Sequence, residues 1–297
     1  MTINNEPLRD VHNKSFKVKF KAIYELVRPE LSLAGGMCII ASQIIVLHSL
    51  PTFFVGVMGF LTGFFISGAA LISNDYFDLD VDRVNHPQRP LPSGRISIME
   101  LMILTGLFTV AGFITAGLLG PVTLGFAVFI WIIAISYNWR FKESGLLGNI
   151  MVGISVAWFF IFGGATVDGL TNGLIWIFAG LAFIFDVGEE IAGDAMDMVG
   201  DEERSSKTLA RLYGKPYALR VSSALFILFT IVSLIPFLIG WLSIIYLVIF
   251  LPIDLVVLYL AMKLLKSQTV EEGRRIIRQL YLTLTIFIIV FVISSIL

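Results

Sequence analysis

Long apolar runs separated by short polar connections dominate the hydropathy pattern of this chain. Each run is close to the ~20 residues that an α-helix needs to cross the hydrocarbon core of a bilayer. We therefore expect an all-α, polytopic membrane protein with nine transmembrane helices. The predicted spans are residues 30–48, 52–73, 100–118, 121–138, 147–167, 172–191, 218–239, 242–262 and 279–297.

The connections between these spans differ sharply in their basic residues. Four connections contain no Lys or Arg, those near residues 49–51, 119–120, 168–171 and 240–241. All 21 basic residues lie in or beside five other regions, which are the N-terminal tail, 74–98, 139–146, 192–220 and 263–278. With nine spans these five regions share one side of the membrane, and the positive-inside rule assigns that side to the cytoplasm. We expect an integral protein of the cell membrane with its N-terminus and active-site loops in the cytoplasm and its C-terminus outside.

The composition agrees with a membrane protein and excludes some kinds of site. Charged residues make up 14% of the chain and hydrophobic residues 57%, whereas soluble domains carry about 25% charged residues. Cys38 is the only cysteine, so neither an internal disulfide nor a cysteine metal site can form. The three histidines are too scattered to form a metal motif. We expect contact with membrane lipid, but no nucleic acid and no obligate protein partner.

No low-complexity linker divides the chain, so we expect one domain over residues 1–297, with a polar tail over residues 1–22. Lys17 to Val27 alternates basic and apolar residues, which suits either a membrane-interface helix or a solvated basic flank. The amphipathic stretch 263–278 favours a separate interface helix. Asp254 is the one acid deep in a span, and we expect it to hydrogen-bond between helices.

A dense polar motif follows the second predicted span. Asn74, Asp78 and Asp82 are spaced at i, i+4 and i+8, so they share one face if the helix continues into the motif. Carboxylates on one helix face repel each other, so a cation must lie beside them. Oxygen ligands without nearby His or Cys favour a hard ion such as Mg²⁺. The motif leads into Arg89-Pro90 and Ser93-Gly94, which predict an ordered turn.

A second acidic motif follows the sixth apolar run and Glu189-Glu190. Asp194, Asp197 and Asp201 are spaced at i, i+3 and i+7, again one helical face. A carboxylate at the centre of a membrane helix costs about 2.5–3.5 kcal/mol on insertion scales. The two motifs must therefore line a polar cavity or lie at its mouth. We expect the nine helices to surround a central cavity with a polar cap on the cytoplasmic side.

These two motifs, with Lys207-Thr208-Leu209 after the second, resemble the two motifs of the UbiA superfamily of intramembrane prenyltransferases, and the resemblance covers nearly the whole chain. It implies transfer of a prenyl group from a prenyl diphosphate to a lipophilic acceptor, dependent on Mg²⁺ and with two ions. Residues 74–97 are most similar to archaeal-type members that add a second geranylgeranyl chain to geranylgeranylglyceryl phosphate, which implies geranylgeranyl diphosphate as donor. Prenylation of an aromatic quinone precursor, of the 4-hydroxybenzoate or dihydroxynaphthoate type, or of haem or chlorophyll stays open.

The resemblance and the residue chemistry together predict individual roles. The predicted metal ligands are Asn74, Asp78, Asp82, Asp194, Asp197 and Asp201. The predicted catalytic residues are Asp78, Asp82, Asp197, Asp201, Lys142 and Lys207, of which the two lysines would contact the diphosphate. The predicted substrate-binding residues are Arg83, Arg89, Tyr137, Arg140 and Asn149. Arg140 and Lys142 could instead only determine topology, and Tyr137 could be an interfacial anchor.

Two other functional classes compete with a prenyltransferase. An ion-coupled transporter would carry its acids near the membrane midplane, often in broken helices. Here the acids cluster at span ends, with the basic residues on one side. A non-catalytic scaffold gives no reason for two clusters of oxygen ligands. The prenyltransferase is therefore the favoured hypothesis.

Overall fold

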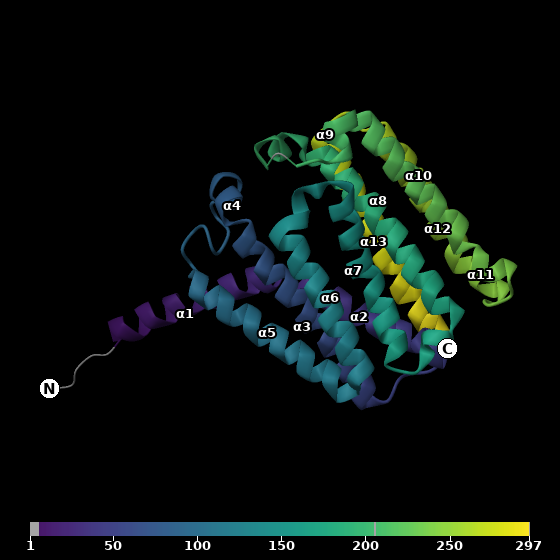
Figure 1. The fold of residues 1–297 in the computed structure, drawn as a ribbon, viewed down its shortest axis with the longest axis horizontal. Coiled ribbons are helices and arrows are strands. Elements are labelled where there is room, and N and C mark those ends of the chain that lie inside the picture. Colours follow the sequence, from purple (N-terminus) through teal and green to yellow (C-terminus); the bar gives the residue numbers. More distant parts are fainter. Residues whose placement is uncertain (1–5, 205, 297) are drawn as a thin grey trace.

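Helices form all the regular secondary structure of the described residues (Figure 1). The computed structural model describes the backbone of residues 6–204 and 206–296, and their side chains except at residues 6–16, Asn85 and 199–204. The helices are α1 (Glu6–Val27), α2 (Pro29–Leu47), α3 (Phe53–Phe77), α4 (Leu79–Asn85), α5 (Ile98–Leu119), α6 (Pro121–Ser136), α7 (Leu146–Ala165), α8 (Gly173–Arg204), α9 (Leu209–Tyr213), α10 (Lys215–Ser233), α11 (Ile235–Leu238), α12 (Leu247–Leu265) and α13 (Val270–Ile296). Short helical turns are η1 (Tyr137–Phe141), η2 (Lys142–Ser144), η3 (Gly169–Thr171) and η4 (Ile244–Tyr246).

The predicted spans correspond to long helices, so the all-α membrane class is confirmed. Among the described residues, eight helical segments are long and apolar enough to cross a membrane. The sixth predicted span lies in α8, which is 32 residues long and carries Asp186, Glu189 and Glu190 near its middle. Helix α8 is not one of these eight, because these acids directly follow its apolar run, and the predicted count of nine is approximate.

Two predicted boundaries are wrong. The stretch 263–278 is not a separate interface helix, because α12 continues to Leu265 and α13 already begins at Val270. The polar tail over residues 1–22 is helical from Glu6, as the first part of α1. Ala22 and Leu26 of α1 are fully buried, in a cluster with Ile72 of α3 and Leu101 of α5.

Local sequence determines where several helices start. Ser97 and Glu100 form a capping box at the start of α5. The Ser97 side chain accepts a hydrogen bond from the Glu100 backbone N–H, and the Glu100 side chain accepts one from the Ser97 backbone N–H. Thr52 caps α3 by accepting the Val55 N–H. Proline occupies the first turn of α2 and of α6, where its missing N–H costs no hydrogen bond.

The helices pack into a bundle joined through α2 and α8. Helix α2 packs against α3, α7 and α13, whereas α8 packs against α7, α10 and α13. In Figure 1, α13 lies alongside α8, so the C-terminal helix closes the second half of the bundle. Ser233 of α10 donates a hydrogen bond to Asp254 of α12 at 2.7 Å. The expected interhelical role of Asp254 is therefore confirmed.

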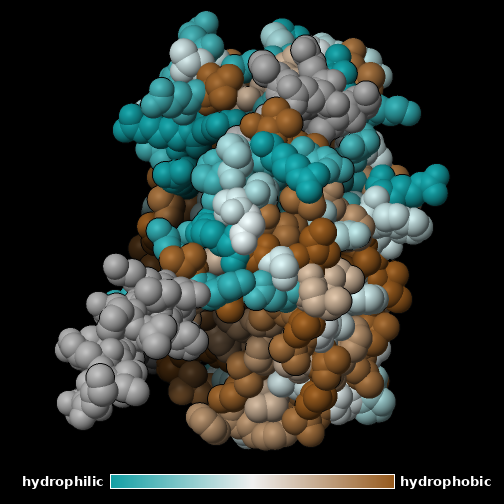
Figure 2. All heavy atoms as spheres, turned by 90° about the vertical axis from the view of Figure 1, so that its left-hand side faces the viewer, coloured by the Kyte–Doolittle hydropathy of each residue, from teal (hydrophilic) through white to brown (hydrophobic). Residues whose placement is uncertain are grey.

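The outward faces of the helices are apolar, as a lipid environment requires. On α5, five apolar residues at helical spacing are each more than half exposed, and these are Ile103, Leu107, Val110, Ile114 and Leu118. Figure 2 shows that hydrophobic residues dominate the lower part of the molecule and hydrophilic residues gather at the upper end. Exposed apolar side chains of this kind are favourable in contact with lipid and unfavourable in contact with water.

The polar loops lie together at one end of the bundle. Helix α4, the connection between α6 and α7, and α9 are at the upper end in Figure 1. The connections from α2 to α3 and from α5 to α6, which lack basic residues, are at the lower end. The described parts of both acidic motifs therefore lie at the same end, as the one-sided distribution of Lys and Arg predicts.

Candidate active site

The first acidic motif lies where α3 ends. Helix α3 ends at Phe77 and α4 begins at Leu79, and Asp78 between them has φ −88° and ψ 0°. The helical hydrogen bonds nevertheless continue, from the Asp78 N–H to the Asn74 carbonyl (2.9 Å) and from the Asp82 N–H to the Asp78 carbonyl (2.8 Å). The condition that the helix continues into the motif therefore fails at Asp78 alone, and the helical register is kept. The Asp78 side chain does not cap α4, and its carboxylate instead accepts hydrogen bonds from Asn74 and Lys142.

Lys142 reaches this motif from the connection between α6 and α7. Its Nζ donates to Asn74 Oδ1 at 2.9 Å and to Asp78 Oδ2 at 2.6 Å. The Asn74 amide donates to the same Asp78 oxygen at 2.9 Å. The side chains of Asp78 and Lys142 are only 8% and 24% exposed, so solvent screens the pair weakly. The predicted catalytic lysine thus lies in a cradle of oxygen atoms.

Two arginines of the first motif have different surroundings. Arg89 Nη1 donates to both oxygens of Asp82, at 2.6 and 2.9 Å, and Asp82 is buried. Arg83 pairs with Asp80 at 2.9 Å, and both of these side chains are largely exposed. Of the two predicted substrate-binding arginines, Arg89 therefore lies within the motif, whereas Arg83 lies on its outer side.

Asp75 has a partner that the sequence analysis did not single out. Arg28 Nη2 lies 2.5 Å from Asp75 Oδ1, and the Asp75 side chain is 3% exposed. Arg28 joins α1 to α2 in the left-handed backbone region (φ 44°, ψ 64°), which is unfavourable for a residue with a Cβ and unusual before proline. The Arg28-Pro29 pair at the start of the first span is the sequence signal that could have identified it.

The loops that carry the two predicted catalytic lysines are joined through their backbones. Lys207 N–H donates to the Glu143 carbonyl at 2.9 Å. Gly145 has φ 65°, and a Cβ there would lie 1.9 Å from the Lys207 carbonyl oxygen, so only glycine permits this approach. Lys142 is therefore held next to the segment after α8, although the Lys207 side chain itself is exposed.

Tyr137 and Arg140 lie in the π-helix η1 that extends α6, a form often found at functional sites. Tyr137 is half-buried and within electrostatic range of Asp78 from the first motif and of Glu190 and Asp194 from α8. Arg140 is exposed. Tyr137 therefore lies between the two acidic clusters, whereas Arg140 lies at their margin.

The second motif continues along α8 as one helix, as its spacing predicts. Asn149 of α7 donates to Asp194 Oδ2 at 2.9 Å. Asp197 pairs with Arg274 of α13 at 2.5 Å, and both side chains are more than half exposed. The side chain of Asp201 lies outside the described residues. The structure thus brings Asn149 to Asp194 and places Asp197 at the open end of α8.

Three further acids precede the second motif on α8, namely Asp186, Glu189 and Glu190. Asp186 Oδ2 is buried and has no hydrogen-bond partner among the described residues. Glu189 and Glu190 stand out in the sequence, whereas the only signal for Asp186 is its position directly after the apolar run Leu174 to Phe185. The desolvation of a buried oxygen of this kind is offset by a cation, a polar ligand or a proton.

The oxygen atoms of the two clusters suit a hard divalent ion, although the described side chains form no ready-made set of ligands. Within the described ranges, no group of three or more His, Cys, Asp or Glu is arranged to hold a metal. Instead the Lys142 ammonium lies between Asn74 and Asp78, and Arg89 covers Asp82. Basic side chains therefore already occupy cation positions with oxygen-only partners. This donor chemistry fits Mg²⁺, which would replace them as the partner of these carboxylates.

Known proteins resemble this chain over most of its length. A curated digeranylgeranylglyceryl phosphate synthase from Thermococcus kodakarensis is 29% identical over 280 residues, which cover 94% of this chain and 99% of the relative. A solved structure from work on digeranylgeranylglyceryl phosphate synthase in membranes has a TM-score of 0.77 and 26% identity, and covers 94% of this chain and 99% of that one. A UbiA homologue from Archaeoglobus fulgidus, solved with GPP and Mg²⁺, has a TM-score of 0.66 and 19% identity, with coverage of 93% and 99%.

The family comparison covers the helices that carry both motifs. Residues 32–291 match the UbiA prenyltransferase family, a range that extends from α2 into α13. The predicted superfamily and the predicted enzyme class are thereby confirmed. This chain belongs to the UbiA prenyltransferase family, as an integral membrane enzyme.

Proposed function

We propose that this protein transfers a geranylgeranyl group from geranylgeranyl diphosphate to geranylgeranylglyceryl phosphate, in a Mg²⁺-dependent step of ether-lipid synthesis. The observation that carries the proposal is the position of Lys142. It bonds to Asn74 and Asp78 of the first motif and lies within electrostatic range of Glu190 on α8. The name of the Thermococcus relative and the GPP and Mg²⁺ bound to the distant Archaeoglobus homologue support the same reading.

The proposed reaction exchanges one C–O bond for another. The allylic C–O bond of the donor breaks and its electron pair leaves with the diphosphate. The acceptor hydroxyl oxygen then bonds to the allylic carbon and loses its proton to water. Mg²⁺, when bound, would neutralise charge on the diphosphate oxygens. The residues proposed to hold it are Asn74, Asp78, Asp82, Asp194, Asp197 and Asp201.

The basic side chains bind and orient the diphosphate in this proposal. The Lys142 ammonium has three N–H donors, and it lies where negative charge develops as the donor bond breaks. Lys207 is exposed beside the same loop and would bind the diphosphate from its outer side. Arg89 and Asn149 would position Asp82 and Asp194, the carboxylates to which they bond. The remaining predicted substrate-binding residues lie between the clusters or at their margin, namely Tyr137, Arg140 and Arg83.

The allylic cation requires apolar surroundings, in which aromatic faces stabilise positive charge. The aromatic cluster of α8, α12 and α13 does not supply them. Its members are 2–4% exposed and pack against one another as part of the core, and they are Phe178, Phe250, Phe287 and Phe291. These residues stabilise the bundle, and the prenyl chains would lie along other apolar faces.

An acceptor panel tests the proposed function. Purified protein in zwitterionic nanodiscs, given geranylgeranyl diphosphate and Mg²⁺, should prenylate geranylgeranylglyceryl phosphate and release one diphosphate per product. Excess EDTA should abolish both signals and added Mg²⁺ should restore them. Efficient prenylation of 4-hydroxybenzoate with none of the glyceryl phosphate would replace the proposal with the quinone-type alternative. Activity that persists in EDTA would refute the metal dependence.

The proposed cytoplasmic orientation predicts the labelling of single cysteines. In a Cys38→Ser background, Ser93→Cys beside the first motif and Tyr213→Cys in α9 should react with an impermeant thiol reagent only after intact cells are opened. Ser49→Cys, in a connection at the opposite end, should react in intact cells. All three positions are exposed. Labelling of Ser93→Cys and Tyr213→Cys from opposite sides would contradict the arrangement of the spans between them.

A further inference from the structure

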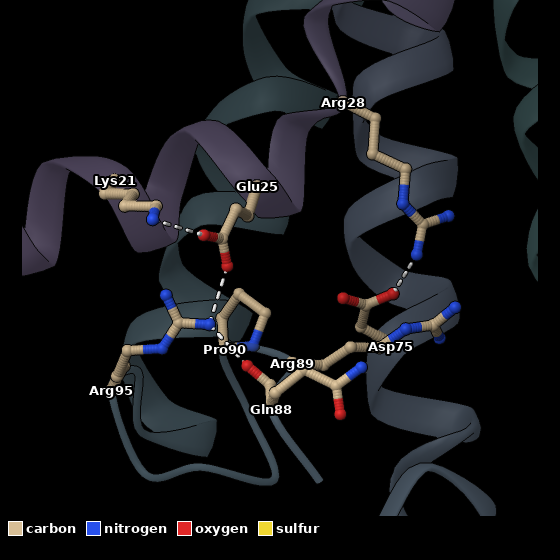
Figure 3. Close-up of a pocket in the computed structure, with 8 residues that line it drawn as sticks. All are labelled: Lys21, Glu25, Arg28, Asp75, Gln88, Arg89, Pro90 and Arg95. Carbon is tan, nitrogen blue, oxygen red and sulfur yellow. Dashed lines mark hydrogen bonds and ion pairs between the residues drawn. The ribbon is translucent and has the colours of Figure 1, made fainter. Parts of the chain in front are cut away.

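A pocket of about 510 Å³ opens beside the first motif (Figure 3). It lies between α1, the end of α3 and the loop of residues 86–97. Because one water occupies about 30 Å³ of liquid, the pocket is far larger than a site for one or two waters. It is lined by Lys21, Glu25, Arg28, Asp75, Gln88, Arg89, Pro90 and Arg95. The proposed binding of the donor diphosphate gives no role to Lys21, Arg28 or Arg95.

Cationic side chains outnumber carboxylates in this pocket by four to two. On one wall, Arg95 lies 2.6 Å and Lys21 4.0 Å from Glu25. The hydrogen bond from Arg95 holds the pKa of Glu25 below its ordinary value, so Glu25 is ionised at neutral pH. On the other wall, Arg28 pairs with Asp75. When Asp82, the partner of Arg89, is also counted, the pocket keeps an excess of one positive charge.

The arginines retain hydrogen-bond donors for a further ligand. Arg28 bonds to Asp75 through Nη2 alone, and Arg89 bonds to Asp82 through Nη1 alone, among the described residues. A guanidinium carries five N–H donors. Figure 3 shows the Arg28 and Arg89 guanidinium groups on either side of Asp75. Their remaining donors suit a planar or tetrahedral oxyanion, and arginine recognises phosphate particularly well.

The pocket also adjoins both the membrane and the reaction site. Helix α1 exposes Phe20, Ile23 and Tyr24 close to Lys21 and Glu25 in sequence, so an apolar surface suited to lipid accompanies the basic pocket. Arg89 lines the pocket and at the same time holds Asp82 of the first motif. A ligand with a phosphate group and a lipid chain matches both surroundings.

We propose that this pocket binds the phosphate monoester of the lipid acceptor, separately from the donor diphosphate; this assignment rests on the proposed function. A phosphate monoester carries about −1.5 to −2 charges at pH 7, which the excess positive charge of the pocket would partly offset. The phosphate would bind to Arg95, Arg28 and Lys21, while the acceptor hydroxyl extends toward the first motif past Arg89. The pocket then distinguishes a phosphorylated lipid acceptor from its dephosphorylated form.

Binding measurements on four variants test the assignment. Without donor, the Kd of geranylgeranylglyceryl phosphate is measured in zwitterionic nanodiscs, with the dephosphorylated alcohol as comparison. Arg95→Gln should raise this Kd on the order of tenfold, the effect of one charge-assisted hydrogen bond. The Lys21 side chain is 75% exposed, so its substitution should affect folding little. Lys21→Gln should raise the Kd of the acceptor about threefold. Arg220→Gln, at an exposed arginine on α10, is the matched control and should leave the Kd unchanged.

Glu25→Gln makes the test sharper because its expected effect has the opposite sign. Loss of this carboxylate frees Arg95 and Lys21 for the phosphate, so the Kd and the acceptor KM should fall about threefold. The KM of the donor should stay unchanged in all four variants. If Glu25→Gln weakens binding as Arg95→Gln does, the ion pair only supports the loop structure, and the proposal is overturned.

Two further binding results would also overturn it, and two combined results of binding and transfer separate it from the proposed function. Equal affinity for the phosphorylated and dephosphorylated acceptor would show that the pocket does not bind the phosphate. Loss of acceptor binding in nanodiscs rich in phosphatidylglycerol would assign the pocket to bulk lipid headgroups. If wild-type protein binds the acceptor through Arg95 but transfers no prenyl group to it, the assignment of the pocket is supported and the proposed function is refuted. If transfer proceeds and no pocket variant changes the acceptor KM, the proposed function is supported and the assignment of the pocket is refuted.

Discussion

The Asp78→Ala variant is expected to lose prenyl transfer by a factor on the order of 10²–10³, the usual effect of removing one preorganised charge-stabilising group. Asp78 is buried at the break between α3 and α4, and it holds both the Asn74 amide and the Lys142 ammonium. Its loss removes a proposed metal ligand and also frees Lys142 from its position. The measurement is the initial rate of diphosphate release at saturating donor, acceptor and Mg²⁺.

Asp80→Ala is the matched control for this variant. Asp80 belongs to the same motif, but its side chain is 92% exposed and, among the side chains that the structure describes, pairs only with Arg83. We expect its activity to stay within a factor of about two of wild type, since exposed ion pairs contribute little. Both variants should keep the wild-type Tm in detergent. Equal activity of Asp78→Ala and Asp80→Ala would show that the arrangement around Lys142 is not the reaction site.

The Arg28→Met variant is expected to lose about 3–5 kcal/mol of stability, because it leaves the Asp75 carboxylate buried without its partner. Arg28 is the only basic residue paired with Asp75 in the described structure, and Asp75 is 3% exposed. For a chain of this size the fall in Tm should be on the order of 10 °C. Thermal unfolding in one detergent, at fixed pH and protein concentration, measures the effect.

A double variant and an exposed ion pair provide the controls. Arg28→Met with Asp75→Asn should recover much of the lost Tm, since the amide avoids a buried unpaired charge. Lys19→Met breaks another pair between α1 and α5, with Glu100 at 2.7 Å, but there both side chains are more than 40% exposed. It should shift Tm only slightly, as surface ion pairs contribute ~0–1 kcal/mol. An equal Tm for Arg28→Met and Lys19→Met would contradict a structural role for the buried pair.

Some helix boundaries depend on interactions within one turn, and others depend on partners far away in the sequence. The capping box of Ser97 and Glu100 and the prolines at the starts of α2 and α6 are readable in the sequence, because their partners lie within one turn. The break at Asp78 and the extension of α13 back to Val270 were not predicted. In the first case Asp78 bonds to Lys142, 64 residues away, and in the second Arg274 bonds to Asp197, 77 residues away. Helical spacing contains no information about such partners.

The sequence by itself determined the membrane class, the approximate spans, the common side of the two acidic motifs and the family. Each of these depends on local hydropathy, on the bias of basic residues, or on short motifs, because a helix in lipid satisfies its backbone within its own segment. Only the tertiary structure decided which cation pairs with which acid. It placed Lys142 at Asn74 and Asp78, Arg28 at Asp75, and Arg95 at Glu25. The reason is that side chains far apart in the chain meet only where helix packing brings them together, and that packing depends on the shapes of all the apolar faces at once.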